Sequence, residues 1–152
     1  MKKITPFLWF DTQAEEAMNF YVSLFKNSKV NNIQRGPDGN AFIVSFELDG
    51  QAFMGLNAGP MFKFNESISM YVHCEDQAEV DYFWNAFIAN GGEESMCGWL
   101  KDKYGLSWQI IPEQLGALTG GPDPEKAARA MEAMLKMQKI IVADLQKAYD
   151  GE

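Results

Sequence analysis

The sequence contains only one histidine, His73, and two cysteines, Cys74 and Cys97, among its 152 residues. Two cysteines do not make a disulfide scaffold, and no Cys/His pair has the spacing of a structural zinc site. Positive charge is also scarce, since 13 Lys and Arg stand against 21 Asp and Glu and give a net charge of −8. An acidic surface repels phosphate backbones and anionic lipids, which argues against nucleic-acid and membrane partners.

Long apolar runs are absent as well. No run approaches the roughly 20 residues that a membrane-spanning helix needs. The apolar segment 4–10 is too short for the core of a signal peptide. We therefore expect a cytoplasmic protein with two free thiols. Apolar residues still make up 47% of the chain and aromatic residues 13%, which is enough to build a packed interior.

An internal repeat organises the chain. Residues 11–15 (DTQAE) are echoed by residues 75–79 (EDQAE). Each echo follows a short apolar run, 4–10 or 68–74, of the kind that forms a buried strand. Each echo also opens an amphipathic helix. Thr12 with Glu15 predicts a capping box for the first helix, and Asp76 predicts the N-cap of the second.

Three strand-like runs, separated by turn signals, follow each helix. The predicted strands are 29–34, 42–48 and 51–56 in the first copy, and 93–97, 99–101 and 106–111 in the second. The sequence thus predicts an α+β fold of two tandem βαβββ modules, about 1–58 and 66–113, within a domain that spans 1–121.

The C-terminal segment 122–152 has a different pattern. Asp123 and Pro124 predict a helix start, with Asp as N-cap and Pro at the first helical position. An apolar stripe then predicts one helix from Pro124 to about Tyr149. Such a stripe must be buried, either on the domain or on a partner subunit, and we expect a homodimer.

Several motifs resemble PhnB-like proteins of the vicinal oxygen chelate superfamily (glyoxalase/bleomycin resistance/dioxygenase), of the type labelled 3-demethylubiquinone-9 3-methyltransferase. The resemblance rests on FDT at 10–12 with FY at 20–21, NAGP at 57–60, CGWLKD at 97–102 and GLSWQIIP at 105–112. It implies that the modules form a shared cleft. It also implies, for enzymes of the superfamily, a divalent metal held by side chains of the first and last strand of each module.

The resemblance places those metal-ligand positions on Pro6, Gly55, Ser69 and Gln109. Proline and glycine have no side-chain donor, and a serine hydroxyl is a weak ligand for zinc or iron. We therefore expect no metal and no other cofactor. The alternative is a metal-dependent lyase, isomerase or dioxygenase, which would need relocated ligands such as His73 and Glu47.

The methyltransferase label is a further alternative. A typical methyl-donor site needs a glycine-rich turn after a strand of a parallel α/β sheet. No Gly-x-Gly follows any predicted strand here. The label therefore has no support from the sequence itself.

Strand alternation extends the four positions into a predicted cleft lining. An apolar lining with a few neutral polar groups suits a small, largely apolar ligand. The other interpretation is that these side chains simply fill the interior of the module. The predicted ligand-binding residues are Leu8, Phe53, Asn57, Ser69, Tyr71 and Gln109. The residues predicted to pack under the helices instead are Phe7, Trp9, Met54, Leu56, Met70, Val72, Trp108 and Ile110.

Cys97 is the single candidate nucleophile, with Lys101 close by in sequence as a cation that would activate the thiol. No histidine or acidic partner lies at a diagnostic spacing from it. A buried, unreactive thiol is the simpler explanation of Cys97, and it is the one we expect.

Overall fold

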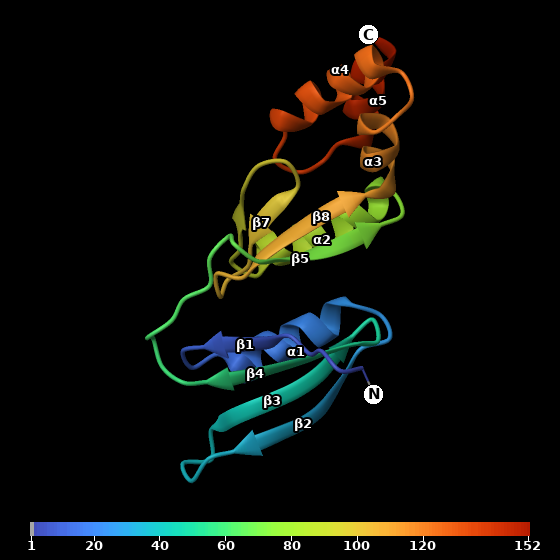
Figure 1. Cartoon of the computed structure of the whole chain (residues 1–152). Coiled ribbons are helices and arrows are strands. Elements are labelled where there is room, and N and C mark those ends of the chain that lie inside the picture. Colours follow the sequence, from blue (N-terminus) through green and yellow to red (C-terminus); the bar gives the residue numbers. More distant parts are fainter. Residues whose placement is uncertain (1) are drawn as a thin grey trace. The chain divides into compact units, whose positions relative to one another are not determined.

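A computed structural model describes residues 2–152 of the protein. The chain divides into two compact units, Met1–Phe64 and Asn65–Glu152, and each contains one four-stranded sheet (Figure 1). The predicted α+β fold is confirmed.

The first unit has the predicted βαβββ order. Its elements are β1 (Phe7–Phe10), α1 (Ala14–Leu24), β2 (Lys29–Arg35), β3 (Ala41–Leu48) and β4 (Gln51–Asn57). The sheet has the order β1-β4-β3-β2. Strand β1 is parallel to β4, and the other pairs are antiparallel. The first and last strands of the unit are therefore neighbours, and β1 forms one edge of the sheet.

The second unit repeats this topology. Its elements are β5 (Ser69–Cys74), α2 (Gln77–Ala89), β6 (Glu93–Glu94), β7 (Trp99–Lys101) and β8 (Ser107–Pro112). The order is β5-β8-β7-β6, with β5 parallel to β8. Strand β6 is shorter than the predicted segment 93–97. Helix α2 covers one face of this sheet and buries Val80, Phe83, Trp84 and Phe87 (Figure 1).

The two helices begin differently. In α2, Asp76 accepts a hydrogen bond of 2.9 Å from the Glu79 backbone N–H, so the predicted cap is confirmed. In α1, the predicted capping box of Thr12 and Glu15 is wrong, because Gln13 is the N-cap residue and its side chain makes no cap bond. A side chain from another element caps the first turn of α1 instead, since the Ala14 N–H donates to Asn57 Oδ1 at 2.8 Å.

The single C-terminal helix is also wrong. The structure has three helices, α3 (Glu113–Thr119), α4 (Pro124–Leu135) and α5 (Val142–Asp150). Asp123 caps α4 as predicted. The segment between α4 and α5 leaves the helix because its carbonyls bond to another part of the unit. Met137 O accepts from the Cys97 N–H at 2.7 Å, and Gln138 O accepts from the Gly98 N–H at 2.8 Å.

This C-terminal segment packs against the end of the second sheet. Ile111 at the end of β8 forms a buried cluster with Leu115, Ile140 and Leu145. Gly98 suits this contact, because its φ of 84° favours glycine and a Cβ there would lie 2.6 Å from Ile111 Cδ1. No helix within residues 2–152 is both long and apolar enough to span a membrane.

Candidate functional site

Strand faces in the first unit are the reverse of those predicted. Phe53 stacks on Phe46, with ring centroids 5.5 Å apart, and Phe46 in turn contacts Tyr21 of α1. Leu8 is the register partner of Gly55, and a Cβ on Gly55 would lie 3.2 Å from Phe10 Cε2. The face that carries Leu8, Phe53 and Gly55 is therefore the face that α1 covers.

Two predicted cleft residues consequently belong to the core of this unit, since Leu8 is 6% exposed and Phe53 is 8% exposed. Phe7 was predicted to pack under a helix but is 50% exposed on the other face. Trp9, Met54 and Leu56 share that uncovered face with Phe7 by strand alternation. The face assignment of β1 and β4 was thus wrong by one residue.

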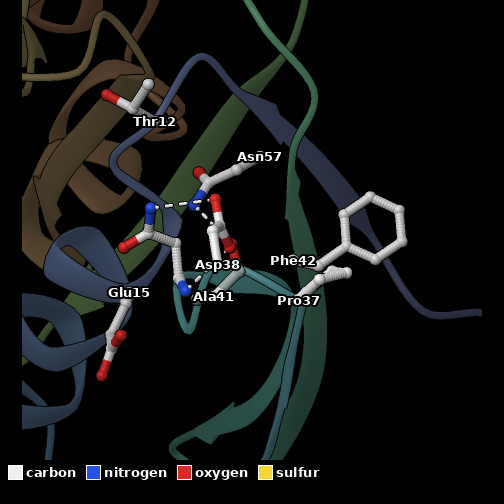
Figure 2. Close-up of a pocket in the computed structure, with 9 residues that line it drawn as sticks. Thr12, Glu15, Pro37, Asp38, Ala41, Phe42 and Asn57 are labelled. Carbon is white, nitrogen blue, oxygen red and sulfur yellow. Dashed lines mark hydrogen bonds between the residues drawn. The ribbon is translucent and has the colours of Figure 1, made fainter.

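Asn57 lines a hollow of about 780 Å³ at the turn between β2 and β3 (Figure 2). Its Oδ1 accepts from Ala14, and its Nδ2 donates to Ala41 O at 3.0 Å. The carboxylate of Glu15 in the same hollow forms an ion pair with Arg35 at 3.0 Å. The polar groups of the hollow therefore bond mainly to the protein itself, and Asn57 serves to fix the start of α1.

The second unit presents a different surface. Trp108 contacts Phe87 of α2, with ring centroids 4.8 Å apart, so the side of the sheet with Leu100, Trp108 and Ile110 faces the helix. The opposite side, here called the open face, carries the alternate residues of three strands. These residues are Ser69, Tyr71 and His73 of β5, Ser107 and Gln109 of β8, and Trp99 and Lys101 of β7, whereas Ile111 at the end of β8 lies on the same side but is buried by the C-terminal segment.

Strand register arranges the open face in rows. One row runs Tyr71–Gln109–Trp99, with an amide between two aromatic side chains. The next row runs Ser69–Ser107–Lys101 and is polar throughout. Neighbouring strands lie about 4.8 Å apart, so each row spans the width of a small ring compound. Ser69, Tyr71 and Gln109 share a face as strand alternation predicted, whereas sequence reasoning missed Trp99 and Lys101.

Polar groups on the open face retain bonding capacity. Gln109 Nε2 donates to Ser69 Oγ at 2.9 Å, which leaves the Gln109 carbonyl and the Ser69 hydroxyl proton for a ligand. Ser107 is 1% exposed, and within the described chain its Oγ has no hydrogen-bond partner. A buried hydroxyl without a partner costs free energy, so this row favours an incoming polar atom.

Lys101 forms an ion pair with Glu66, which lies just before β5. The bond from Lys101 holds the pKa of Glu66 below its usual value, and the bond to Glu66 raises the pKa of Lys101. Both side chains are accessible, with exposed fractions of 35% for Lys101 and 60% for Glu66. The cation of the polar row is thus held by a solvent-exposed carboxylate.

Asp102, in the turn between β7 and β8, determines how these rows are aligned. It is 4% exposed, and its carboxylate accepts hydrogen bonds from Tyr104 N, Leu106 N and Trp108 Nε1 at 2.9, 3.0 and 2.9 Å. These three bonds fix the turn between β7 and β8. This turn sets the register of β7 against β8, in which Trp99 is opposite Gln109 and Lys101 is opposite Ser107.

Cys97 lies immediately before β7 at a positive φ of 59°. Its N–H bonds to Met137, its thiol is half-buried, and it forms no disulfide. The ammonium group of Lys101 pairs with Glu66. The structure thus ties Cys97 to the C-terminal segment through its backbone.

A divalent metal does not fit the donors that the open face offers. At the positions inferred from the family resemblance its first and last strands present Ser69 and Gln109, a hydroxyl and an amide that already bond to each other, and His73 of the first strand packs beside Tyr71 with ring centroids 4.7 Å apart. The equivalent face of the first unit presents Phe7 and Met54, which are register partners on β1 and β4. Among residues 2–152 no group of three or more His, Cys, Asp or Glu side chains could hold a metal ion.

Comparisons with known proteins identify the family. Residues 2–111 match the family model described as 3-demethylubiquinone-9 3-methyltransferase. A PhnB protein from Bacillus cereus is 38% identical, with 73% of this chain and 99% of that chain covered and a TM-score of 0.68. The segment after Ile111, which includes α3, α4 and α5, lies outside the family match. Curated proteins yield no match.

More distant solved structures share the fold. Protein PA1353 from Pseudomonas aeruginosa is 18% identical, covering 74% of this chain and 98% of that one, with a TM-score of 0.61. A fosfomycin resistance protein, FosX from Listeria monocytogenes, is 12% identical, covering 71% and 90%, with a TM-score of 0.51. Since the family model spans most of the sequence and the Bacillus PhnB protein supports it, the chain belongs to the 3-demethylubiquinone-9 3-methyltransferase family of PhnB-like proteins.

Proposed function

We propose that the protein binds a small, largely apolar ring compound on the open face of its second unit, without a metal. The row Tyr71–Gln109–Trp99 carries this proposal. Its two aromatic side chains can stack on the ring of a ligand, and the amide between them can form a hydrogen bond with a substituent of that ring. Tyr71 is 49% exposed, so its ring is available to a ligand. Of the residues predicted from sequence, Ser69, Tyr71 and Gln109 remain in the proposed site, and Leu8, Phe53 and Asn57 leave it.

The test is binding of a panel of small aromatic compounds, measured by thermal shift and by backbone amide NMR. We expect at least one compound to stabilise the protein and to shift the amides of β5, β7 and β8. Trp99→Leu and Gln109→Leu should each weaken that binding about tenfold, the effect of roughly 1.4 kcal/mol. Tyr82→Leu, which removes an exposed ring on α2, is the matched control and should leave binding unchanged. Shifts confined to the first unit would reject the proposal.

Metal-dependent chemistry is the principal alternative, since fold membership alone does not give function. A lyase, isomerase or dioxygenase would need nitrogen or carboxylate ligands. Our proposal instead rests on the side chains that the first and last strands of the two units present. These are the hydroxyl of Ser69, the amide of Gln109 and the thioether of Met54. Elemental analysis of protein purified without a histidine tag decides the matter. Stoichiometric zinc, iron, manganese or nickel would favour the enzyme.

The methyltransferase activity in the family description is a third possibility. It requires a site for a nucleoside-bearing methyl donor. Calorimetry with S-adenosylmethionine tests it directly, and saturable binding would replace our proposal with a methyl-transfer role.

We also propose a homodimer located in the cytoplasm. Large apolar side chains are exposed on the uncovered face of the first unit and on α4, where Met131 and Leu135 are 41% and 58% exposed. Apolar patches of this kind favour association. Two free thiols suit a reducing compartment. Light scattering coupled to size exclusion should give twice the chain mass, and a monomer at micromolar concentration would contradict the dimer.

A further inference from the structure

The polar row on the open face contains features that the proposed ring-binding site does not use. Lys101 is the cation of this row, and Ser69 and Ser107 lie beside it on successive strands. The Ser107 hydroxyl is buried, and no group in the described chain bonds to it. The row therefore offers an ammonium group and two hydroxyl donors side by side. Of these three groups, only the ammonium pairs with a charged side chain.

Glu66 supplies that charge. Its carboxylate reaches Lys101 from the loop before β5 and is 60% exposed to solvent. Solvent-exposed ion pairs contribute little to stability, so a competing carboxylate displaces such a partner at small cost. Glu66 also does not satisfy Ser107, whose Oγ stays without a partner in the part of the chain that the structure describes.

We propose that the ligand of the open face is an aromatic carboxylate, whose carboxylate group takes the place of Glu66 on Lys101 while its ring lies over Tyr71, Gln109 and Trp99. This inference rests on the proposed function and names its ligand class. The rows are adjacent, because Ser107 and Gln109 are two positions apart on β8, or about 7 Å along the strand. That distance matches the separation between a carboxylate and the far edge of the ring it is attached to.

A monoanion fits better than a phosphate. Glu93 of β6 is the register partner of Lys101 of β7. Lys101 therefore lies between two carboxylates, those of Glu93 and Glu66. The whole chain carries a net charge of −8. A dianion would meet more repulsion here than a carboxylate, and one ammonium group balances one negative charge.

The test compares 2-naphthoate with its uncharged amide, 2-naphthamide, by calorimetry at physiological salt. We expect the carboxylate to bind about tenfold more tightly, as charge-assisted hydrogen bonds exceed neutral ones. Glu66→Gln removes the competing carboxylate and should tighten naphthoate binding about threefold without changing naphthamide. Lys101→Met should abolish the preference for the carboxylate. 2-Naphthyl phosphate should bind more weakly than naphthoate.

Matched controls lie on the same hairpin and strand. Lys103→Met removes a lysine two residues from Lys101, and Glu94→Gln removes an exposed carboxylate of β6; neither should alter the naphthoate preference. Equal affinity for the two naphthyl probes, or no tightening in Glu66→Gln, overturns the carboxylate assignment but leaves the ring site standing. Failure of both probes overturns the assignment as well, and the aromatic panel then decides separately whether the ring site survives.

Discussion

The side chain of Gln77 holds the backbone on both sides of residue 141, although Gln77 and Ile140 are 63 residues apart. Its Nε2 donates to Ile140 O at 3.0 Å, and its Oε1 accepts from Val142 N at 2.7 Å. Lys139 adds an ion pair to Asp81, one turn further along α2, at 3.0 Å. One glutamine in the first turn of α2 therefore fixes the segment that separates α4 from α5.

Replacing Gln77 by alanine should release this segment. Three hydrogen bonds are lost, two to this segment and one to Asp81, and we expect a decrease of about 2 kcal/mol in the free energy of unfolding, measured with urea. The Val142 amide, which loses its acceptor, should exchange its hydrogen at least about fivefold faster. Gln146→Ala removes an amide that bonds only within α5 and should change neither quantity. Unaltered exchange at Val142 would show that other contacts hold the segment.

The same substitution has a consequence for Asp81. The hydrogen bond from Gln77 is the largest cause of its lowered pKa, followed by the bond from Lys139. A carboxylate with a lowered pKa stabilises the fold above its unfolded value and loses that effect as the pH falls through the folded pKa. In Gln77→Ala the Asp81 carbon resonance should therefore titrate at higher pH, closer to the unfolded value, and the acid-dependent loss of stability that Asp81 causes should be smaller than in the unaltered protein.

Asp102 offers a second test, because its carboxylate accepts three hydrogen bonds at a buried turn. Asp102→Asn replaces one acceptor oxygen by an N–H group, which then faces another donor. We expect a destabilisation of about 2 kcal/mol by urea unfolding, together with weaker ligand binding as the register of β7 against β8 loosens. Asp38→Asn is the control, since Asp38 lies in the exposed turn between β2 and β3. Equal effects of the two substitutions would contradict the role of Asp102.

Much of the architecture could be predicted from the sequence, because its causes are local. Asp76 and Asp123 cap the helices that follow them, and the turns after β3 and β7 carry residues suited to tight reversal. The apolar stripe of α1 appears as buried residues of the structure. Element order and type follow from such signals.

The face of each strand in the first unit could not be predicted in the same way. Segment 4–10 is apolar on both sides, so alternation does not reveal which side the helix covers. A shift of one residue moves every side chain to the opposite face. The helix break after Leu135 depends on Cys97, Gly98 and Gln77, which are distant in sequence and override a strong helical pattern.

Asn57 supports a third prediction, which tests whether this residue stabilises the fold or binds the ligand. Its amide accepts from Ala14 N and donates to Ala41 O, so both ends of the amide are used. Asn57→Asp keeps the acceptor but loses the donor, and we expect a loss of about 1 kcal/mol; Asn57→Leu should lose about 2 kcal/mol. Neither variant should change the affinity for an aromatic compound measured by calorimetry. A change in affinity without a change in stability would return Asn57 to the binding site.

The two thiols give a last prediction. Cys74 is 2% exposed, and burial, helped by the negative charges of Glu79 and Asp76, raises its pKa to about 12. Because the thiolate is the reactive form, Cys74 should resist iodoacetamide at pH 8 in the folded protein. Cys97 is only partly buried and should accept one equivalent, detected by mass spectrometry.

Cys97→Ser should then show no labelling until urea unfolds the chain, which confirms that Cys74 is protected by the fold. The raised pKa also means that the folded state holds the Cys74 proton more tightly than the unfolded state does. The associated stability is complete below pH 9 and falls as the pH rises toward 12. Cys74→Ala should remove this alkaline decline, so a decline of equal slope in both proteins would assign it to another group.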